Sequence, residues 1–186
     1  MDIDKLSKCG KLRYFNSESF ICIEGNEGTT AFLVLKGYVE VILGTFKDKN
    51  RNVARIDEGA FFGEMSMLEG TPRSATVIAG GGGVTVLEIG KDDFLKVMKT
   101  EPEIAFKLLK MLYNRIEDTL YKSDRRMVAY AAEIRRDKTY NEIGTLNLQQ
   151  FIVIVRQQED YVLKLLTYLS HTLSRIDKEL MDRVSK

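Results

Sequence analysis

The chain of 186 residues has few of the residue types on which most enzyme classes depend: it has no tryptophan, one histidine, two cysteines and two prolines. Two cysteines, Cys9 and Cys22, cannot build a disulfide framework, so a reducing cytoplasmic location is expected. One histidine and two cysteines also leave too few ligands for a zinc site or for a Cys/His nucleophile pair. No pair of catalytic carboxylates can be assembled either, so the sequence predicts a protein that is not an enzyme and holds no metal.

The sequence also lacks an excess of one charge and a long apolar run. Its 28 lysines and arginines are balanced by 27 acidic residues, for a formal net charge of +1. This balance excludes binding of nucleic acid through bulk positive charge, but leaves a local basic patch open. The longest aliphatic run, from Phe151 to Val155, is too short to span a bilayer, and the first ten residues lack the apolar core of a signal peptide. We therefore expect a protein that is neither exported nor inserted in a membrane.

Glycine, in contrast, is abundant and unevenly distributed. All of the 14 glycines except Gly10 and Gly144 lie between Gly25 and Gly90. Short segments rich in β-branched and aromatic residues alternate with these turn residues and predict strands at 20–23, 31–35, 38–43, 53–56, 75–79 and 84–89. No segment of helical length separates them, which favours an antiparallel sandwich or barrel over a parallel sheet.

After Gly90 the apolar spacing changes from two residues to about 3.6, the period of a helix. This spacing predicts helices at 92–98, from Pro102 to about residue 120, at 125–136 and at 159–184. Two of them carry long apolar stripes: Ile104, Leu108, Leu112, Ile116 and Leu120 in the first, and Val162, Leu165, Leu166, Leu169, Leu173, Ile176 and Leu180 in the second. The predicted fold class is α+β: an antiparallel β-roll, of the double-stranded β-helix or jelly-roll-like barrel type, followed by an all-helical C-terminal segment.

The helical part contains a candidate internal repeat. An offset of 57 residues aligns Phe94 with Phe151 and places several apolar positions of the two stripes in register: Leu108 with Leu165, Leu109 with Leu166, Leu112 with Leu169 and Ile116 with Leu173. Two interpretations remain open. Any two amphipathic helices share leucines, or the end of the chain is a second, truncated copy of the preceding helices.

The segment at residues 61–77, with the sequence FFGEMSMLEGTPRSATV, carries the chemistry. Gly63 allows close backbone approach, and residues 64–68 can form one helical turn whose free N–H groups suit an anion. Pro72 restrains Arg73, whose planar guanidinium can donate two parallel hydrogen bonds to a phosphate, while Glu64 can accept a hydrogen bond from a ribose hydroxyl. The groups therefore describe a nucleotide with one phosphate and a free 2′-OH. A simple ion pair between Glu64 and Arg73 is the alternative.

This segment resembles the phosphate-binding cassette of the cyclic nucleotide-binding domain family, found in catabolite activator proteins and in regulatory subunits of cAMP-dependent protein kinase. The family pattern F-G-E-x7-P-R-x-A-T-V is met without gaps by Phe62, Gly63, Glu64, Pro72, Arg73, Ala75, Thr76 and Val77. The turns around Gly25, Gly28 and Gly37 resemble those of the family's barrel, and the similarity covers about residues 10–120. The resemblance implies a nucleotide-binding domain with its helices at 1–122 and a helical tail at 123–186, for dimerisation or output.

The resemblance also implies roles for individual residues toward a cyclic nucleotide, either cAMP or cGMP, with no further cofactor. Arg73 would bind the exocyclic phosphate oxygens, Glu64 would accept the ribose 2′-OH, and Gly63 would give the sugar room. Backbone amides would complete the cradle: those near Met65 and Ser66, and that of Ser74.

The base would be covered by a side chain of the long helix after the barrel. Thr119 is the candidate there, with Tyr113 and Tyr121 as aromatic alternatives. The hydroxyl of Ser74 follows Arg73, but in relatives such a hydroxyl contacts either the phosphate or a guanine amino group. It therefore does not decide between the two bases.

Three functions follow from these features. The first is a non-enzymatic cyclic nucleotide sensor that relays a conformational change through its C-terminal helices to a second copy or to a partner protein. The second is a transcription regulator of the catabolite-activator type. Residues 123–186 hold eleven Lys or Arg and nine Asp or Glu and show no clear helix-turn-helix, so the sequence gives DNA binding little support. The third is an interaction module with vestigial nucleotide binding.

Overall fold

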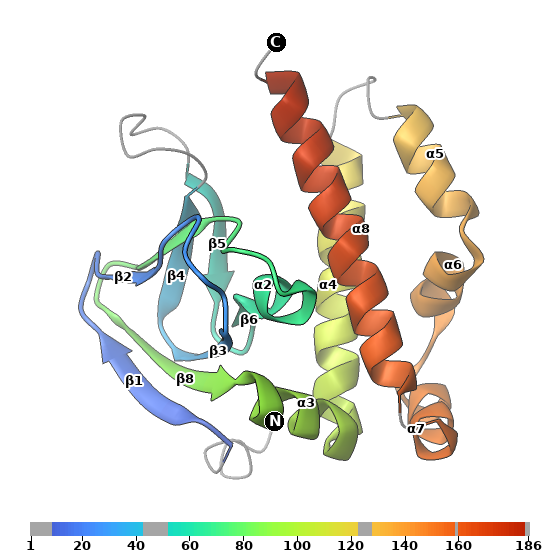
Figure 1. Cartoon of the computed structure of the whole chain (residues 1–186), viewed down its shortest axis with the longest axis horizontal. Helices are drawn as coiled ribbons and strands as arrows, with labels where there is room; N and C mark the ends of the chain where they lie inside the picture. The colour runs from blue at the N-terminus through green and yellow to red at the C-terminus, as the bar shows by residue number, and fades with distance from the viewer. Residues whose placement is uncertain (1–8, 43–51, 123–127, 159, 185–186) are drawn as a thin grey trace. The chain divides into compact units, whose positions relative to one another are not determined.

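A computed structural model describes residues 9–42, 52–122, 128–158 and 160–184 (Figure 1). The chain divides into two compact units, residues Met1–Val97 and Met98–Lys186. The first unit holds the strands and the second holds most of the helices, so the α+β class predicted from the sequence is confirmed. Among the described residues, no helix is long and apolar enough to cross a membrane.

Two antiparallel sheets of four strands form the first unit. One sheet has the order β1-β8-β3-β6, and the other has the order β2-β7-β4-β5. The strands are β1 (Lys11–Phe15), β2 (Phe20–Cys22), β3 (Thr30–Lys36), β4 (Tyr38–Ile42), β5 (Asn52–Asp57), β6 (Phe61–Phe62), β7 (Thr76–Ala79) and β8 (Val84–Gly90). The predicted strands are all present, whereas the sequence patterns did not reveal β1 and β6. Residue 43, the end of one predicted strand, lies outside the described residues.

A core of apolar side chains from both sheets holds the first unit together. The buried members of this core are Cys22, Phe32, Val34, Val39, Phe62, Val77, Ala79, Val84 and Val86. The rings of Phe32 and Phe62 stack with their centroids 4.9 Å apart, which joins β3 to β6 through their side chains as well as their backbones. Because β6 leads directly into the segment that carries the chemistry, this stack fixes where that segment begins.

Two helices belong wholly or largely to the first unit. A short helix, α2 (Glu64–Glu69), follows β6 and corresponds to the helical turn predicted at residues 64–68. The second, α3 (Lys91–Thr100), follows β8. Phe94 of α3 meets Phe61 edge to face, with ring centroids 6.2 Å apart. Burial of Phe94 thus secures α3 against the strand that precedes α2.

The second unit consists of helices. They are α4 (Pro102–Lys122), α5 (Val128–Arg136), α6 (Lys138–Thr145), α7 (Leu148–Gln157) and α8 (Tyr161–Val184). The predicted helix at 125–136 corresponds to α5, although residues 125–127 lie outside the described residues. The prediction missed α6 and α7, because each is short and their apolar residues do not form a long stripe.

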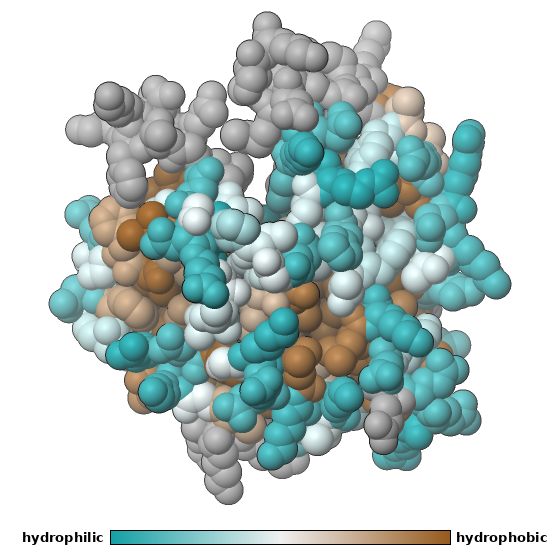
Figure 2. All heavy atoms as spheres, in the orientation of Figure 1, coloured by the Kyte–Doolittle hydropathy of each residue, from teal (hydrophilic) through white to brown (hydrophobic). Residues whose placement is uncertain are grey.

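The long helices α4 and α8 pack side by side in this unit (Figure 1). Their predicted stripes are buried: Ile104, Leu108, Leu112, Ile116 and Leu120 in α4, and Val162, Leu165, Leu166, Leu169, Leu173 and Ile176 in α8. The side chain of Leu180 lies outside the described part. Hydrophilic side chains predominate on the face of this unit seen in Figure 2, with smaller hydrophobic areas between them. The two stripes therefore serve, at least in part, a contact within one chain.

The helix boundaries bear on the predicted repeat. Helix α7 has the same ten-residue length as α3, and its bounds follow those of α3 by the predicted offset of 57. Phe94 and Phe151, the aligned aromatic residues, are both fully buried. The aligned leucine pairs are buried as well. The interpretation as a truncated second copy stays a prediction, and the matching helix bounds favour it over chance.

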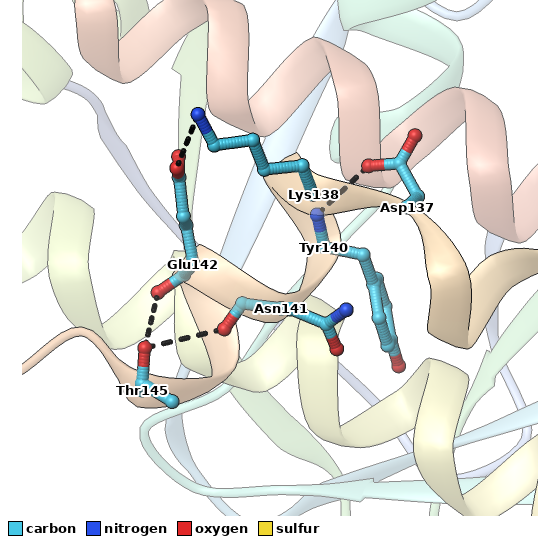
Figure 3. A network of polar contacts seen from close by, with 6 residues as sticks. All are labelled: Asp137, Lys138, Tyr140, Asn141, Glu142 and Thr145. Carbon is cyan, nitrogen blue, oxygen red and sulfur yellow. Dashed lines mark hydrogen bonds and ion pairs between the residues drawn. The ribbon is translucent and has the colours of Figure 1, made fainter.

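Polar contacts lie at both ends of α6 (Figure 3), and others link α6 to α4. Asp137 caps the start, where its Oδ1 accepts a hydrogen bond of 3.0 Å from the N–H of Tyr140. The buried Tyr140 donates its hydroxyl to Glu117 of α4 at 2.7 Å, and its ring stacks on Tyr113. At the other end Lys110 of α4 donates to the carbonyl oxygens of Ile143 and Gly144. These contacts bind α6 to α4.

Replacing Asp137 with alanine tests the cap of α6. The loss of one N-cap is expected to lower the free energy of unfolding by about 1 kcal/mol. Lys138→Ala is the matched control, because its ion pair with Glu142 is exposed and should contribute about 0.5 kcal/mol or less. Denaturant unfolding at pH 7 measures both. Equal effects of the two substitutions would contradict the capping role.

The cap should also depend on pH in a defined direction. The hydrogen bond from the Tyr140 N–H, and then that from Tyr168, hold the pKa of Asp137 below its usual value. A carboxyl whose pKa is lower in the folded state stabilises the fold above its unfolded pKa. The difference between the native chain and Asp137→Ala should therefore shrink as the pH falls through the folded pKa of Asp137.

Candidate functional site

The segment 61–77 connects two strands from different sheets. It begins as β6, which pairs with β3, and it ends as β7, which pairs with β2 and β4. Gly63 separates β6 from α2 with φ of 73° and ψ of 1°, and Gly70 ends α2 with φ of 67°. Both glycines adopt the left-handed conformation, which other residues rarely tolerate. The left-handed glycines at its two ends thus limit α2 to a short helix in the connection between the two sheets.

The side chain of Arg73 lies at the centre of this segment and is only 7% exposed. Its Nη1 donates to the carbonyl oxygen of Gly63 at 2.6 Å and to Oγ of Ser66 at 3.1 Å. Its Nη2 donates to two oxygens of Thr30, the carbonyl at 2.7 Å and the hydroxyl at 3.1 Å. The guanidinium therefore joins α2 to the first residue of β3.

The backbone of Arg73 is held as firmly as its side chain. Its N–H donates to the carbonyl oxygen of Asn26 at 2.8 Å, and its own carbonyl accepts from the N–H of Gly25 at 2.9 Å. Close by, the hydroxyl of Thr76 accepts a hydrogen bond of 3.1 Å from the N–H of Glu24. The loop before β3 and the loop before β7 are thus paired, and they fix the origin of the arginine side chain.

All four acceptors of the Arg73 guanidinium are uncharged oxygens. A buried guanidinium whose hydrogen-bond acceptors are neutral favours an anion nearby. The site is therefore electrostatically suited to a phosphate.

The other predicted residues of the cassette differ in their burial. Glu64, Met65 and Ser66 are buried in α2, with Glu64 only 2% exposed, whereas Ser74 is exposed. The site also influences Cys22 on β2, which no prediction had included. Burial raises the pKa of the Cys22 thiol, and the neighbouring Arg73 opposes this effect only in part. Cys22 consequently stays a neutral core residue.

Two glycines are required here by close packing. A Cβ atom on Gly63 would lie 2.5 Å from Nη1 of Arg73 and 3.3 Å from the carbonyl oxygen of Thr30. A Cβ on Gly28 would lie 2.5 Å from Oγ of Ser66. Contacts this short force a neighbour to move, so both glycines keep the arginine and its acceptors in place.

The residues predicted to cover the base lie on α4, in the second unit. Thr119 donates its hydroxyl to the carbonyl of Arg115 at 2.7 Å within the helix, and Tyr121 is 87% exposed. Tyr113 stacks on Tyr140 with ring centroids 4.7 Å apart. The role of these residues toward a base stays a prediction. In the described ranges, no cluster of His, Cys, Asp and Glu could hold a metal ion.

Two features of the site were not apparent in the sequence. Thr30 and the Asn26 carbonyl both bind Arg73, yet they precede it by more than forty residues. The glycines at 25 and 28 marked a turn, but nothing in the pattern showed that this turn pairs with residue 73. Such a contact depends on β-sheet pairing between distant segments, which a motif cannot reveal.

Comparison with known sequences bears on the same part of the chain. A family model described as the cyclic nucleotide-binding domain matches residues 12–101. Human cGMP-dependent protein kinase 2 is 32% identical over 105 residues, which cover 54% of this chain and 14% of the kinase. The cyclic AMP receptor protein of Thermus thermophilus is 29% identical over 118 residues, covering 60% of this chain and 54% of that protein. The chain thus spans well under two thirds of the length of either relative.

Solved structures share the fold. A transcriptional regulator from Thermotoga maritima matches with a TM-score of 0.56 and 21% identity, covering 63% of this chain and 91% of that one. A cAMP-binding acyltransferase from Mycobacterium smegmatis matches with a TM-score of 0.54 and 21% identity, covering 63% and 36%. Identities this low concern the fold alone. Residues 12–101, which contain the whole cassette, thus match the model of the cyclic nucleotide-binding domain family.

Proposed function

We propose that this chain binds a purine cyclic nucleotide, cAMP or cGMP, and uses the binding energy to regulate a partner rather than to catalyse a reaction. The observation that carries the proposal is the buried guanidinium of Arg73. It lies beside α2, its acceptors are uncharged, and it belongs to the part of the chain that matches the family model. A singly charged cyclic phosphate would pair with the positive charge of this guanidinium.

The proposed contacts are those that the family resemblance implies. Arg73 binds the exocyclic phosphate oxygens, and the buried carboxylate of Glu64 accepts the ribose 2′-OH. The amides of Met65, Ser66 and Ser74 complete the phosphate cradle, and Gly63 leaves space for the sugar. Thr119 of α4 contacts the base. Burial of the phosphate is tolerable because a guanidinium and several N–H groups pair with it.

The proposed output passes from the first unit through α3 into α4 and its packing partner α8. A ligand shifts a conformational equilibrium only as far as it binds one state more tightly, so the helices must lie differently in the two states. We further propose that the chain acts in the cytoplasm and contacts a second copy or a regulated protein through its helices. Light scattering with and without nucleotide measures the association.

Isothermal titration calorimetry of the full chain with cAMP and with cGMP tests the binding. Saturable binding of at least one of them is expected, and 5′-AMP, which has a doubly charged open phosphate, should bind more weakly. Both cyclic nucleotides are needed because the names of the relatives refer to cGMP in one case and to cyclic AMP in another. Absence of heat with either nucleotide, confirmed by an unchanged melting temperature, would refute the proposal.

The alternative as a transcription regulator makes a separate prediction of salt-dependent DNA binding. The candidate stretch for a recognition helix, residues 169–180 of α8, carries the leucine and isoleucine side chains of Leu169, Leu173 and Ile176, and these are buried. They therefore cannot reach a base edge in this packing. A gel shift with mixed DNA that appears only on addition of nucleotide would favour that alternative over a protein partner.

A further inference from the structure

We propose that Thr30 is a positioning residue for Arg73, so that its hydroxyl, although outside the cassette, contributes to the affinity for cyclic nucleotide. This inference rests on the proposed function, since it concerns the same phosphate site. Thr30 is the first residue of β3 and lies 43 positions before the arginine. It is half-buried, whereas its neighbour Thr29 is exposed.

The two oxygens of Thr30 share one nitrogen of the guanidinium. The carbonyl accepts from Nη2 at 2.7 Å and the hydroxyl accepts from the same Nη2 at 3.1 Å. With a single acceptor on Nη2, the guanidinium could still rotate about that hydrogen bond. Two acceptors on the same nitrogen restrain the plane of the guanidinium. Nη1 is fixed in the same way by the Gly63 carbonyl and the Ser66 hydroxyl.

Fixing the plane matters because an arginine side chain has many rotamers. Ordering such a side chain during binding opposes association, and holding it beforehand removes that penalty. The acceptors that do so here come from two elements, β3 and α2. Three residues accept hydrogen bonds from the guanidinium: Gly63, Ser66 and Thr30. Of these, Thr30 lies on β3, outside the segment 61–77 that would surround a phosphate. Its hydroxyl can therefore orient the guanidinium without itself needing to contact the ligand.

Three variants of the full chain separate this role from a structural one. Thr30→Val keeps the β-branched shape and removes the hydroxyl, Thr30→Ser keeps the hydroxyl, and Thr29→Val makes the same change one residue away. Calorimetry with whichever of cAMP and cGMP binds the native chain should give a dissociation constant about tenfold higher for Thr30→Val. The Thr30→Ser and Thr29→Val chains should stay within about threefold of the native value.

A double-mutant cycle with Arg73→Ala tests whether the hydroxyl acts through the arginine. In the Arg73→Ala background, Thr30→Val should change the residual affinity, measured by competition at high nucleotide concentration, by about twofold or less. Thermal denaturation of each variant without nucleotide confirms that it is folded.

Several results would overturn the inference. Native or tighter binding by Thr30→Val would mean that the phosphate displaces the hydroxyl or ignores it. An equal loss in both backgrounds would mean that Thr30 acts on the fold and not on Arg73. These results leave the proposed function standing if the native chain binds, whereas a native chain that binds neither nucleotide refutes both proposals.

Discussion

Arg73→Ala should lower the affinity for cyclic nucleotide by at least about a hundredfold. A hydrogen bond to a charged group contributes about 1.5–3 kcal/mol, and the guanidinium is proposed to make two with the phosphate. Each such bond corresponds to about a tenfold change in the dissociation constant or more. The substitution also leaves the buried carbonyls of Gly63 and Thr30 without their arginine donor. A lower melting temperature is therefore expected together with the loss of binding.

Calorimetry and thermal denaturation of matched arginine variants measure the two effects. Arg73→Lys retains the charge without the planar fork, so its affinity should lie between those of the native chain and Arg73→Ala. Arg13→Ala is the control for removal of an arginine from the same unit. Its side chain is 57% exposed and pairs with Glu88, so little change in affinity is expected. Unaltered binding by Arg73→Ala would remove the basis of the proposed site.

Gly63→Ala is expected to have the second largest effect, with a loss of affinity of at least about tenfold. The substitution acts in two ways. Alanine in the left-handed conformation costs about 1–2 kcal/mol. In addition, its Cβ would lie 2.5 Å from Nη1 of Arg73, so the guanidinium or the turn must move. Displacement of the guanidinium spoils its geometry toward a phosphate.

Gly70→Ala separates these two contributions. Gly70 has a similar φ of 67°, at the other end of α2, but a Cβ there would meet nothing within 4 Å. Its substitution therefore reports the backbone strain alone. We expect both variants to melt at lower temperature and only Gly63→Ala to lose a large part of its nucleotide affinity. A similar loss of affinity in both would attribute the effect to α2 as a whole and contradict the contact with Arg73.

The sequence predicted those parts of the fold whose signal is local. Strands such as β3 and β8 are runs of β-branched and apolar residues between glycines, and the stripes of α4 and α8 repeat with the helical period. The two-residue strand β6 has no such signal, since its contacts are with a distant segment: it pairs with β3, and Phe62 stacks on Phe32. Helices α6 and α7 were missed for a related reason. They depend on contacts with α4, including those of Tyr140 with Glu117 and of Phe151 with Phe106.

The candidate site divides in the same way. The cassette from Phe62 to Val77 is contiguous, so its motif could be recognised and its turn geometry anticipated. The partners of Arg73 outside the cassette could not be anticipated. Thr30, Gly25 and Asn26 contact it only because distant loops come together in the fold. The guanidinium donates to carbonyl and hydroxyl oxygens, and no pattern of charges in the sequence predicts these acceptors.

The close packing of α4 on α8 restricts how any movement could spread through the helical unit. Side chains of packed helices interlock as ridges in grooves, and such a contact has a few discrete arrangements rather than a continuous range. A displacement of α4 must therefore either carry α8 with it as one rigid pair or exchange one set of leucine contacts for the next, about one helical turn or 5.4 Å away. In the first case α8 would keep its place on α4, and in the second it would shift along α4. A label near the end of α8 could report which of the two movements occurs.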